Sequence, residues 1–463
     1  MTTARWHGGA RAGVTLLAAA MLVPAASPPA AAGAAGAAAT AGAARAAATA
    51  GAARAAATAV DTSCTQQRTK PVYVPETSTA LIDMGYQLVW GLATGRGVTV
   101  AVVDSGINVK NAHLPADSAV APGGTFVGAV EGWIPDPTGR NDLSGHGTAV
   151  ASIIAGRPVQ GSGQVGLARD ALIMPMQVFG ISEEQRSSDD KLNALLPRTE
   201  WLAAGIRTAA ERGAKVINVS LSLDRPDQAL ADAVTFANQQ GALVVASAGD
   251  RGTAANTADG PRYPAAFPNV VSVTAVTAGY AVDIANNLQG DHITIAAPGQ
   301  GLNAALNDMG DCVLSGAAAT SYATPLVAAT AALLAQKYPN ESPAMWKYRI
   351  ESSAQRPLGD TKDAALGWGV LSPYDALTMT LDPNRPGPAM PGHAAPPKKV
   401  EREAVGAVEP EGDPNATNRQ IGIWMAFLTV VGVGGLRLVR VLRRGPDRSG
   451  PGLHGIHEGG VHE

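Results

Sequence analysis

Apolar runs of two kinds follow one another through the middle of this chain. The β-branched run at residues 98–103 is typical of a parallel strand that is buried on both faces. An apolar helical run follows at residues 149–155, and a longer one at residues 323–337 contains no glycine. The long separations between these runs leave room for several strand–helix units. The pattern therefore predicts an α/β fold with a mostly parallel central sheet.

The amino-terminal end carries a different apolar pattern. Arg5 and Arg11 precede an uncharged apolar stretch at residues 12–23, which ends before Pro24 and is followed by small residues. This order is typical of a secretory signal peptide, which we assign to residues 1–32. A membrane span is the alternative interpretation, but the stretch is short for crossing a bilayer.

A segment of very low complexity comes next. Residues 33–60 consist almost entirely of Ala, Gly and Thr, and the sequence of residues 42–50 repeats at residues 51–59. Alanine favours helix, but this segment has no apolar face to bury. We expect a flexible or transiently helical lead-in, followed by an N-terminal extension at residues 61–84.

The carboxyl-terminal end predicts a membrane anchor. Residues 381–420 are rich in Pro, Gly and charge and are expected to form an extended linker. An uncharged run then begins at residue 421, and we predict a transmembrane helix at residues 421–442 that contacts membrane lipid. A buried core helix is the alternative, but no domain follows. Basic residues at the end of the run predict a cytoplasmic tail at residues 443–463 and an extracytoplasmic main domain. They are Arg437, Arg440, Arg443 and Arg444.

Three short motifs carry candidate chemistry. Asp104 ends the strand at residues 98–103, His146 lies between two glycines at the start of a helical run, and Ser321 opens the long apolar helix. The carboxyl end of a strand is where α/β folds build their sites, and helix N–H groups beside a hydroxyl suit an anionic transition state. Each motif alone is common in turns and loops. Their combination predicts an Asp/His/Ser set for nucleophilic catalysis.

The motifs and several further segments resemble the subtilisin-like serine proteases (subtilases), and among these the mycosins. The resemblance covers roughly residues 85–380, which we take as the catalytic domain, and it implies a three-layer fold. Besides the three motifs, it rests on residues 216–222, 263–273, 295–299 and 367–373.

This resemblance implies a role for each candidate residue. Ser321 would be the nucleophile, His146 the general base and later the acid, and Asp104 the group that orients the imidazole. The resemblance also implies that the strand that pairs with the substrate backbone contributes the substrate-binding residues. These are Ser220, Leu221 and Ser222. The implied partners are a protein or peptide substrate and the type VII secretion membrane complex with which mycosins are associated.

Two positions depart from the family pattern. Subtilases place an Asn that donates to the oxyanion where this chain has Asp250. An ionised carboxylate cannot donate, although a protonated one can, and loss of such a donor costs about 10²–10³ in turnover. The alternative is that Asp250 is a neighbour and another group serves. Ala319 replaces a Gly, which would cost stability if the position required positive φ or a close backbone approach.

Two cysteines, Cys64 and Cys312, are present in the whole chain. Outside the membrane an even pair favours a disulfide. The bond would join the N-terminal extension to the loop before Ser321, an arrangement that resembles the extension around the mycosin catalytic domain.

Charge and ligand patterns exclude other classes of protein. The net charge of −3 and the lack of a basic stripe exclude a nucleic-acid partner. No cofactor or metal is expected. The acidic cluster within residues 180–199 lacks calcium-loop spacing and is read as a solvated or partner-contact surface insertion. A tail with three histidines is read as disordered, since no further ligand completes a metal site: His454, His457 and His462.

Three functions stay open on these grounds. The first is a membrane-anchored extracytoplasmic endopeptidase associated with type VII secretion, with low activity because of Asp250. The second is a catalytically weak subtilase that acts mainly as a structural component of the secretion assembly. A degradative surface protease is the third, and the predicted anchor argues against it.

Overall fold

The computed structural model describes residues 62–394, except for 65–67, 183–184, 187, 252–257 and 357–360. The predicted signal peptide (1–32), the Ala-rich segment (33–60), most of the linker and the predicted transmembrane helix (421–442) lie outside the described residues. Within the described part, no helix has both the length and the apolar character needed to cross a bilayer.

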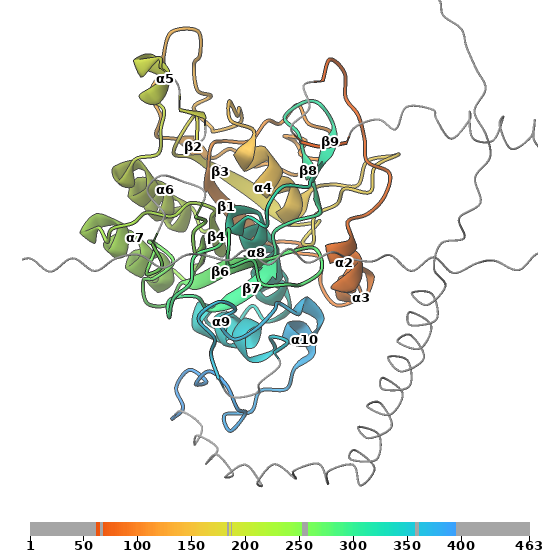
Figure 1. The fold of residues 1–463 in the computed structure, drawn as a ribbon, viewed down its shortest axis with the longest axis vertical. Coiled ribbons are helices and arrows are strands. Elements are labelled where there is room, and N and C mark those ends of the chain that lie inside the picture. The colour runs from red at the N-terminus through yellow and green to blue at the C-terminus, as the bar shows by residue number, and fades with distance from the viewer. Residues whose placement is uncertain are drawn as a thin grey trace, which may run out of the picture. The chain divides into compact units, whose positions relative to one another are not determined.

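A seven-stranded sheet forms the centre of the domain (Figure 1). Every strand pair in it is parallel, which confirms the predicted α/β architecture. The strands, in spatial order, are β2 (Gly124–Thr125), β3 (Leu172–Gln177), β1 (Thr99–Asp104), β4 (Val216–Val219), β5 (Leu243–Ser247), β6 (Val271–Val276) and β7 (Ile295–Pro298).

Strand β1 illustrates why these apolar runs form a doubly covered sheet. Val100 and Val102 face one hydrophobic core, whereas Ala101 and Val103 face a second core on the other side. Side chains alternate along a strand, so an unbroken apolar run fits only where both faces are buried. The carboxyl end of β1 therefore brings Asp104 out at the edge of the sheet.

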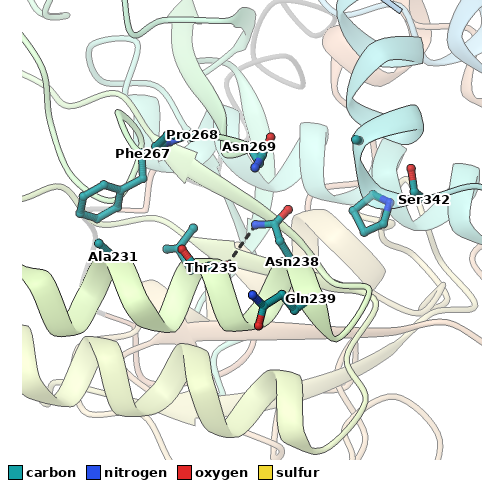
Figure 2. A pocket seen from close by; sticks show the side chains of 11 residues that line it. Ala231, Thr235, Asn238, Gln239, Phe267, Pro268, Asn269 and Ser342 are labelled. Carbon is teal, nitrogen blue, oxygen red and sulfur yellow. Dashed lines mark hydrogen bonds between the residues drawn. The ribbon is translucent and has the colours of Figure 1, made fainter. Parts of the chain in front are cut away.

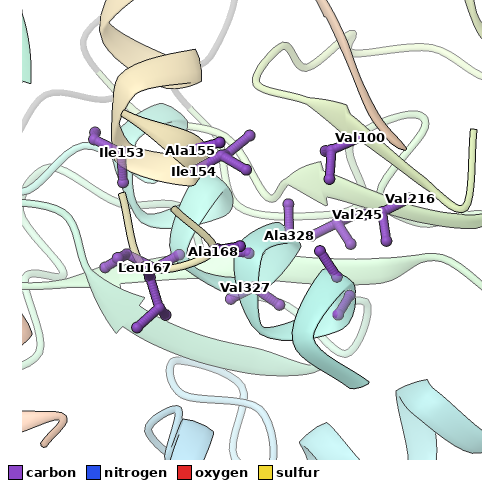
Figure 3. Packing of buried hydrophobic residues seen from close by; sticks show 14 of the residues in the cluster. Val100, Ile153, Ile154, Ala155, Leu167, Ala168, Val216, Val245, Val327 and Ala328 are labelled. Carbon is purple, nitrogen blue, oxygen red and sulfur yellow. The ribbon is translucent and has the colours of Figure 1, made fainter. Parts of the chain in front are cut away.

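Helices cover both faces of the sheet. Helices α4 (His146–Ala155) and α8 (Thr320–Lys337) pack on one face, and α6 (Thr199–Glu211) and α7 (Gln228–Gln239) lie together on the other (Figure 1). Figure 3 shows side chains of α4 and α8 in the same hydrophobic cluster as Val100 and Val245 of the sheet. The result is the predicted three-layer arrangement.

Smaller elements surround this core. They are α2 (Thr79–Asp83), α3 (Tyr86–Trp90), α5 (Asp190–Asn193), the antiparallel hairpin of β8 (Leu302–Ala305) and β9 (Asp311–Leu314), α9 (Pro343–Ser352) and α10 (Pro373–Thr378).

A disulfide joins Cys64 to Cys312 across a sequence separation of 248 residues. The predicted pairing is thus confirmed. The same region is held by hydrogen bonds between side chains and backbone: the N–H of Val74 donates to the carboxylate of Asp311, and the guanidinium of Arg68 donates to the Asp311 carbonyl. The N-terminal extension is therefore tied to hairpin β8–β9, which directly precedes α8.

The strand order reverses at β1, since β3 pairs on one side of it and β4 on the other. Connections on the two sides of such a point leave in opposite directions, and a crevice opens at the carboxyl ends of the strands. Asp104 lies at this point.

Candidate active site

Asp104 and His146 form the centre of the site. The His146 Nδ1 atom lies 2.8 Å from Oδ1 of Asp104, whose side chain is fully buried. A carboxylate only accepts, so Nδ1 carries the proton and donates to Asp104. The backbone N–H of Ser105 donates to the same oxygen at 2.8 Å. Asp104 is thus held in place from two directions.

The start of α4 explains how His146 is positioned. Gly145, with φ of 87°, caps the helix, and its N–H donates to Asp142 at 2.8 Å. Asp142 also accepts from the N–H and the hydroxyl of Thr148, at 2.9 Å and 2.6 Å. A Cβ on Gly147 would lie 2.2 Å from the carbonyl oxygen of Gly106. Only glycine allows α4 to approach the end of β1 this closely.

Ser321 lies in the first turn of α8, as predicted from the sequence. Its carbonyl oxygen accepts a hydrogen bond from Ser220 Oγ at 2.8 Å, and Asn218 Nδ2 donates to Ser220 at 3.0 Å. The ring of Tyr322 lies 5.2 Å from the His146 ring, between centroids. Helix α8 therefore begins between the end of β4 and the catalytic candidate His146.

The departure at Ala319 has no conformational cost. Ala319 is the N-cap of α8 with φ of −101° and ψ of 131°, an extended backbone that any residue adopts. In the structure, residue 319 therefore does not require positive φ.

Asp250 lies beside helix α8, which carries Ser321. Its Oδ1 atom accepts a hydrogen bond from the backbone N–H of Thr320 at 2.9 Å. Thr320 is also held through its hydroxyl, which lies 2.6 Å from Ser247 Oγ at the end of β5. A carboxylate at a helix N-terminus is favourable because N–H groups and the helix dipole both favour negative charge there. Asp250 thus acts as an acceptor in this arrangement.

The three predicted substrate-binding residues lie along the segment that leaves β4. Ser220 donates to the Ser321 carbonyl, Leu221 packs against the second core, and Ser222 lies close to Gly249. The structure thus brings all of the predicted site residues except the disulfide pair to the carboxyl ends of β1, β4 and β5.

Two supporting residues were missed from the sequence. Asp142 precedes His146 by four positions, and burial raises the pKa of its carboxyl above the ordinary value. Ser105 follows Asp104, and its Oγ accepts from the Gly147 N–H at 2.8 Å. The tendency of Asp to accept from backbone N–H groups a few positions later, near a helix start, is a signal that could have found Asp142.

No group of three His, Cys, Asp or Glu able to hold a metal occurs among the described residues. The three histidines of the tail lie outside them. A pocket of about 460 Å³ between α7, Phe267 and the start of α9 contains none of the predicted site residues (Figure 2). It lies near the amino ends of β5 and β6, which is the opposite edge of the sheet from Asp104.

Comparisons of sequence agree with this geometry. The model of the subtilase family, peptidase S8, matches residues 95–369. Mycosin-1 from Mycobacterium tuberculosis (strain ATCC 25618 / H37Rv) is 30% identical over 390 residues, which cover 76% of this chain and 82% of the relative. Thermitase from Thermoactinomyces vulgaris is 33% identical over 270 residues, or 58% of this chain and 85% of the relative.

Solved structures give the same result. The crystal structure of MycP1 from the ESX-1 type VII secretion system superposes with a TM-score of 0.57 at 27% identity, covering 70% of this chain and 93% of that one. A chain of the periplasmic assembly from the ESX-5 inner membrane complex gives a TM-score of 0.56 at 26% identity, with 71% and 92% covered. The chain therefore belongs to the subtilase family of serine endopeptidases, and its relatives place it among the mycosins.

Proposed function

We propose that the chain is a membrane-anchored, extracytoplasmic endopeptidase of a type VII secretion system, with Ser321, His146 and Asp104 as its catalytic residues. The Oγ atom of Ser321 attacks the scissile carbonyl carbon and passes its proton to Nε2 of His146. His146 then protonates the leaving amine, and water hydrolyses the acyl-enzyme by the reverse proton path. Asp104 orients the imidazole and stabilises its charged form.

The contact between Asp104 and His146 carries this proposal. The donation from Nδ1 to a buried carboxylate fixes the tautomer in which Nε2 is the proton acceptor. A serine hydroxyl is a weak nucleophile until an adjacent base takes its proton. Helix α8 supplies this serine close to the imidazole ring, as the position of Tyr322 indicates.

We further propose that turnover is low at neutral pH, because Asp250 is the predicted oxyanion residue. As an acceptor from Thr320, its carboxylate adds negative charge close to where the oxyanion develops. Preorganised hydrogen-bond donors at an oxyanion position raise the reaction rate by about 10²–10³-fold, and an anion at that position gives no such increase.

The place of the enzyme in the cell rests on the relatives and on the ends of the chain. The MycP1 neighbour comes from a type VII secretion system, and another neighbour is part of an inner-membrane complex with a periplasmic assembly. The predicted signal peptide at residues 1–32 and anchor at residues 421–442 put the catalytic domain on the outer side, with residues 443–463 in the cytoplasm. Carbonate extraction of the full chain and of a chain ending at residue 420 tests the anchor: only the shorter one is released.

Labelling with a fluorophosphonate probe tests the catalytic part of the proposal. The full-length protein should be labelled, and Ser321→Ala should not. Labelling that persists in Ser321→Ala would show that another residue reacts and would overturn the assignment.

The structural role in the secretion assembly is the second candidate, and the acceptor role of Asp250 favours it. In cells lacking the chain, the two functions predict different results for Ser321→Ala. Restored secretion of type VII substrates with the Ser321→Ala chain supports the structural role. Secretion that only the parent chain restores supports the endopeptidase.

A further inference from the structure

Two chain segments border the nucleophile on the side away from His146. One leaves β4 and is bonded to the Ser321 carbonyl through Ser220, and the other leaves β5 and is bonded to Thr320 through Asp250. His146 must reach the leaving amine, so the leaving group lies toward α4. The acyl side of the substrate therefore lies over the crevice between the segments at residues 220–223 and 248–250.

The side chain of Arg262 occupies the space between these two segments. Gly249 has φ of 101°, and a Cβ built on it would lie 3.1 Å from Cγ of Arg262 and 3.1 Å from Oγ of Ser222. The methylene stem of Arg262 thus lies at the place where the β4 and β5 segments face each other. Leu288 closes the same space from a third side, since its Cδ1 lies 3.0 Å from that Cβ position.

Backbone contacts hold Arg262 in this position. Its guanidinium donates to the carbonyl oxygens of Ala258 at 2.7 Å and of Pro261 at 3.0 Å, and the residue is only 6% exposed. The next residue, Tyr263, exchanges backbone hydrogen bonds with Leu223 at 2.8 Å and 2.9 Å. The stem cannot swing away without breaking these bonds, so it acts as a fixed floor.

We infer that Arg262 is a specificity-determining residue that restricts the enzyme to substrates with a small side chain on the acyl side of the scissile bond. This inference rests on the proposed nucleophile, Ser321. A large apolar or aromatic side chain would need the volume that the Arg262 stem fills, in a close-packed site. A cationic side chain would also approach the guanidinium, and like charges in a partly dry site repel.

Activated phosphonates test this inference without knowledge of the natural substrate. Aminoalkyl diphenyl phosphonates react when Ser321 Oγ attacks phosphorus and phenoxide leaves, and their side chain occupies the acyl-side position. The rates of an alanine and a phenylalanine phosphonate on the full-length protein give a selectivity ratio. A fluorophosphonate, which carries no such side chain, reports the reactivity of Ser321 alone.

The parent protein should prefer the alanine phosphonate by about tenfold or more, the scale on which pockets discriminate side-chain size. Arg262→Ala should shift the ratio toward phenylalanine by about tenfold or more. Arg262→Met keeps most of the volume and should stay selective for alanine. Arg225→Ala is the matched control, because Arg225 is an arginine of the same region whose side chain is 88% exposed, and its ratio should equal that of the parent.

Each outcome separates this inference from the proposed function. A parent protein that reacts with neither the phosphonates nor the fluorophosphonate contradicts the proposed function. Fluorophosphonate labelling together with a parent preference for phenylalanine overturns the role of Arg262, even if Arg262→Ala does not fold. The role of Arg262 is also overturned if Arg262→Ala is labelled by the fluorophosphonate but has the same alanine-to-phenylalanine rate ratio as the parent. If the ratio of Arg262→Met shifts as much as that of Arg262→Ala, the argument from side-chain volume is overturned.

Discussion

The carboxylate of Asp250 accepts a hydrogen bond from the backbone N–H of Thr320 at 2.9 Å, one position before the proposed nucleophile. A single carboxylate thus caps the helix that carries Ser321 and belongs to the residue that we propose at the oxyanion position. The two uses conflict, because capping favours the ionised acceptor whereas transition-state stabilisation requires a donor.

Replacing Asp250 by Asn should relieve this conflict. The amide oxygen of Asn keeps the bond from Thr320, and its NH₂ group supplies a donor to the oxyanion. We expect fluorophosphonate labelling at neutral pH to rise by about tenfold or more. Asp250→Ala, which loses both cap and donor, is the control and should not rise. Equal or lower labelling of Asp250→Asn over pH 5–9 would contradict an oxyanion position for residue 250.

Asp142→Ala should lower both stability and activity, because it leaves three donors at the start of α4 without their acceptor. Buried donors without partners cost about 1–3 kcal/mol each, so the free energy of unfolding should fall by about 3 kcal/mol or more. Since His146 begins the same helix, kcat should fall more than KM changes. Urea unfolding and steady-state kinetics measure the two effects. A drop in stability with unchanged kcat would limit Asp142 to a structural role.

His292 should make the fold sensitive to mild acid. Burial lowers the pKa of His292 below the ordinary value of 6.5, and the nearby Arg262 and Lys362 lower it further. The bond to the Ala248 carbonyl and the charge of Asp291 act in the opposite direction. The unfolded chain therefore takes up a proton at a pH where the native His292 stays neutral. Stability should be lost as the pH falls through 6.5 toward the lower folded value. In His292→Asn, urea midpoints measured from pH 7.5 to 5 should decline less; an identical decline would remove His292 as a cause.

Removing both cysteines should destabilise the domain without changing the site. Cys64 and Cys312 close a loop of 248 residues, which in the chain-entropy model contributes about 5 kcal/mol. The double variant Cys64→Ser/Cys312→Ser should unfold at correspondingly lower denaturant concentration. The parent in reducing buffer should behave like this variant. A parent whose unfolding midpoint is unaffected by reductant would show that the extension is held by its other contacts, such as that of Val74 with Asp311.

The sequence allowed much of the fold to be predicted, because apolar runs with period-specific patterns report burial directly. The run around Val100 and the helix that Ser321 opens were both found in this way. The position of Arg262 could not be predicted, since it depends on segments that meet only in the folded chain. Ala319 shows the converse: a departure from a family pattern had no conformational cost, because the backbone there is extended.

The order in which the site residues occur along the chain has a consequence for biogenesis. Asp104 and His146 belong to the first strands and helices of the domain, whereas Ser321 lies on α8, which packs against β4, β5, β6 and β7. A chain that has been synthesised only as far as β9 holds the proposed base and its orienting carboxylate but not the proposed nucleophile. The proposed catalytic set therefore stays incomplete until almost all of the catalytic domain has been synthesised.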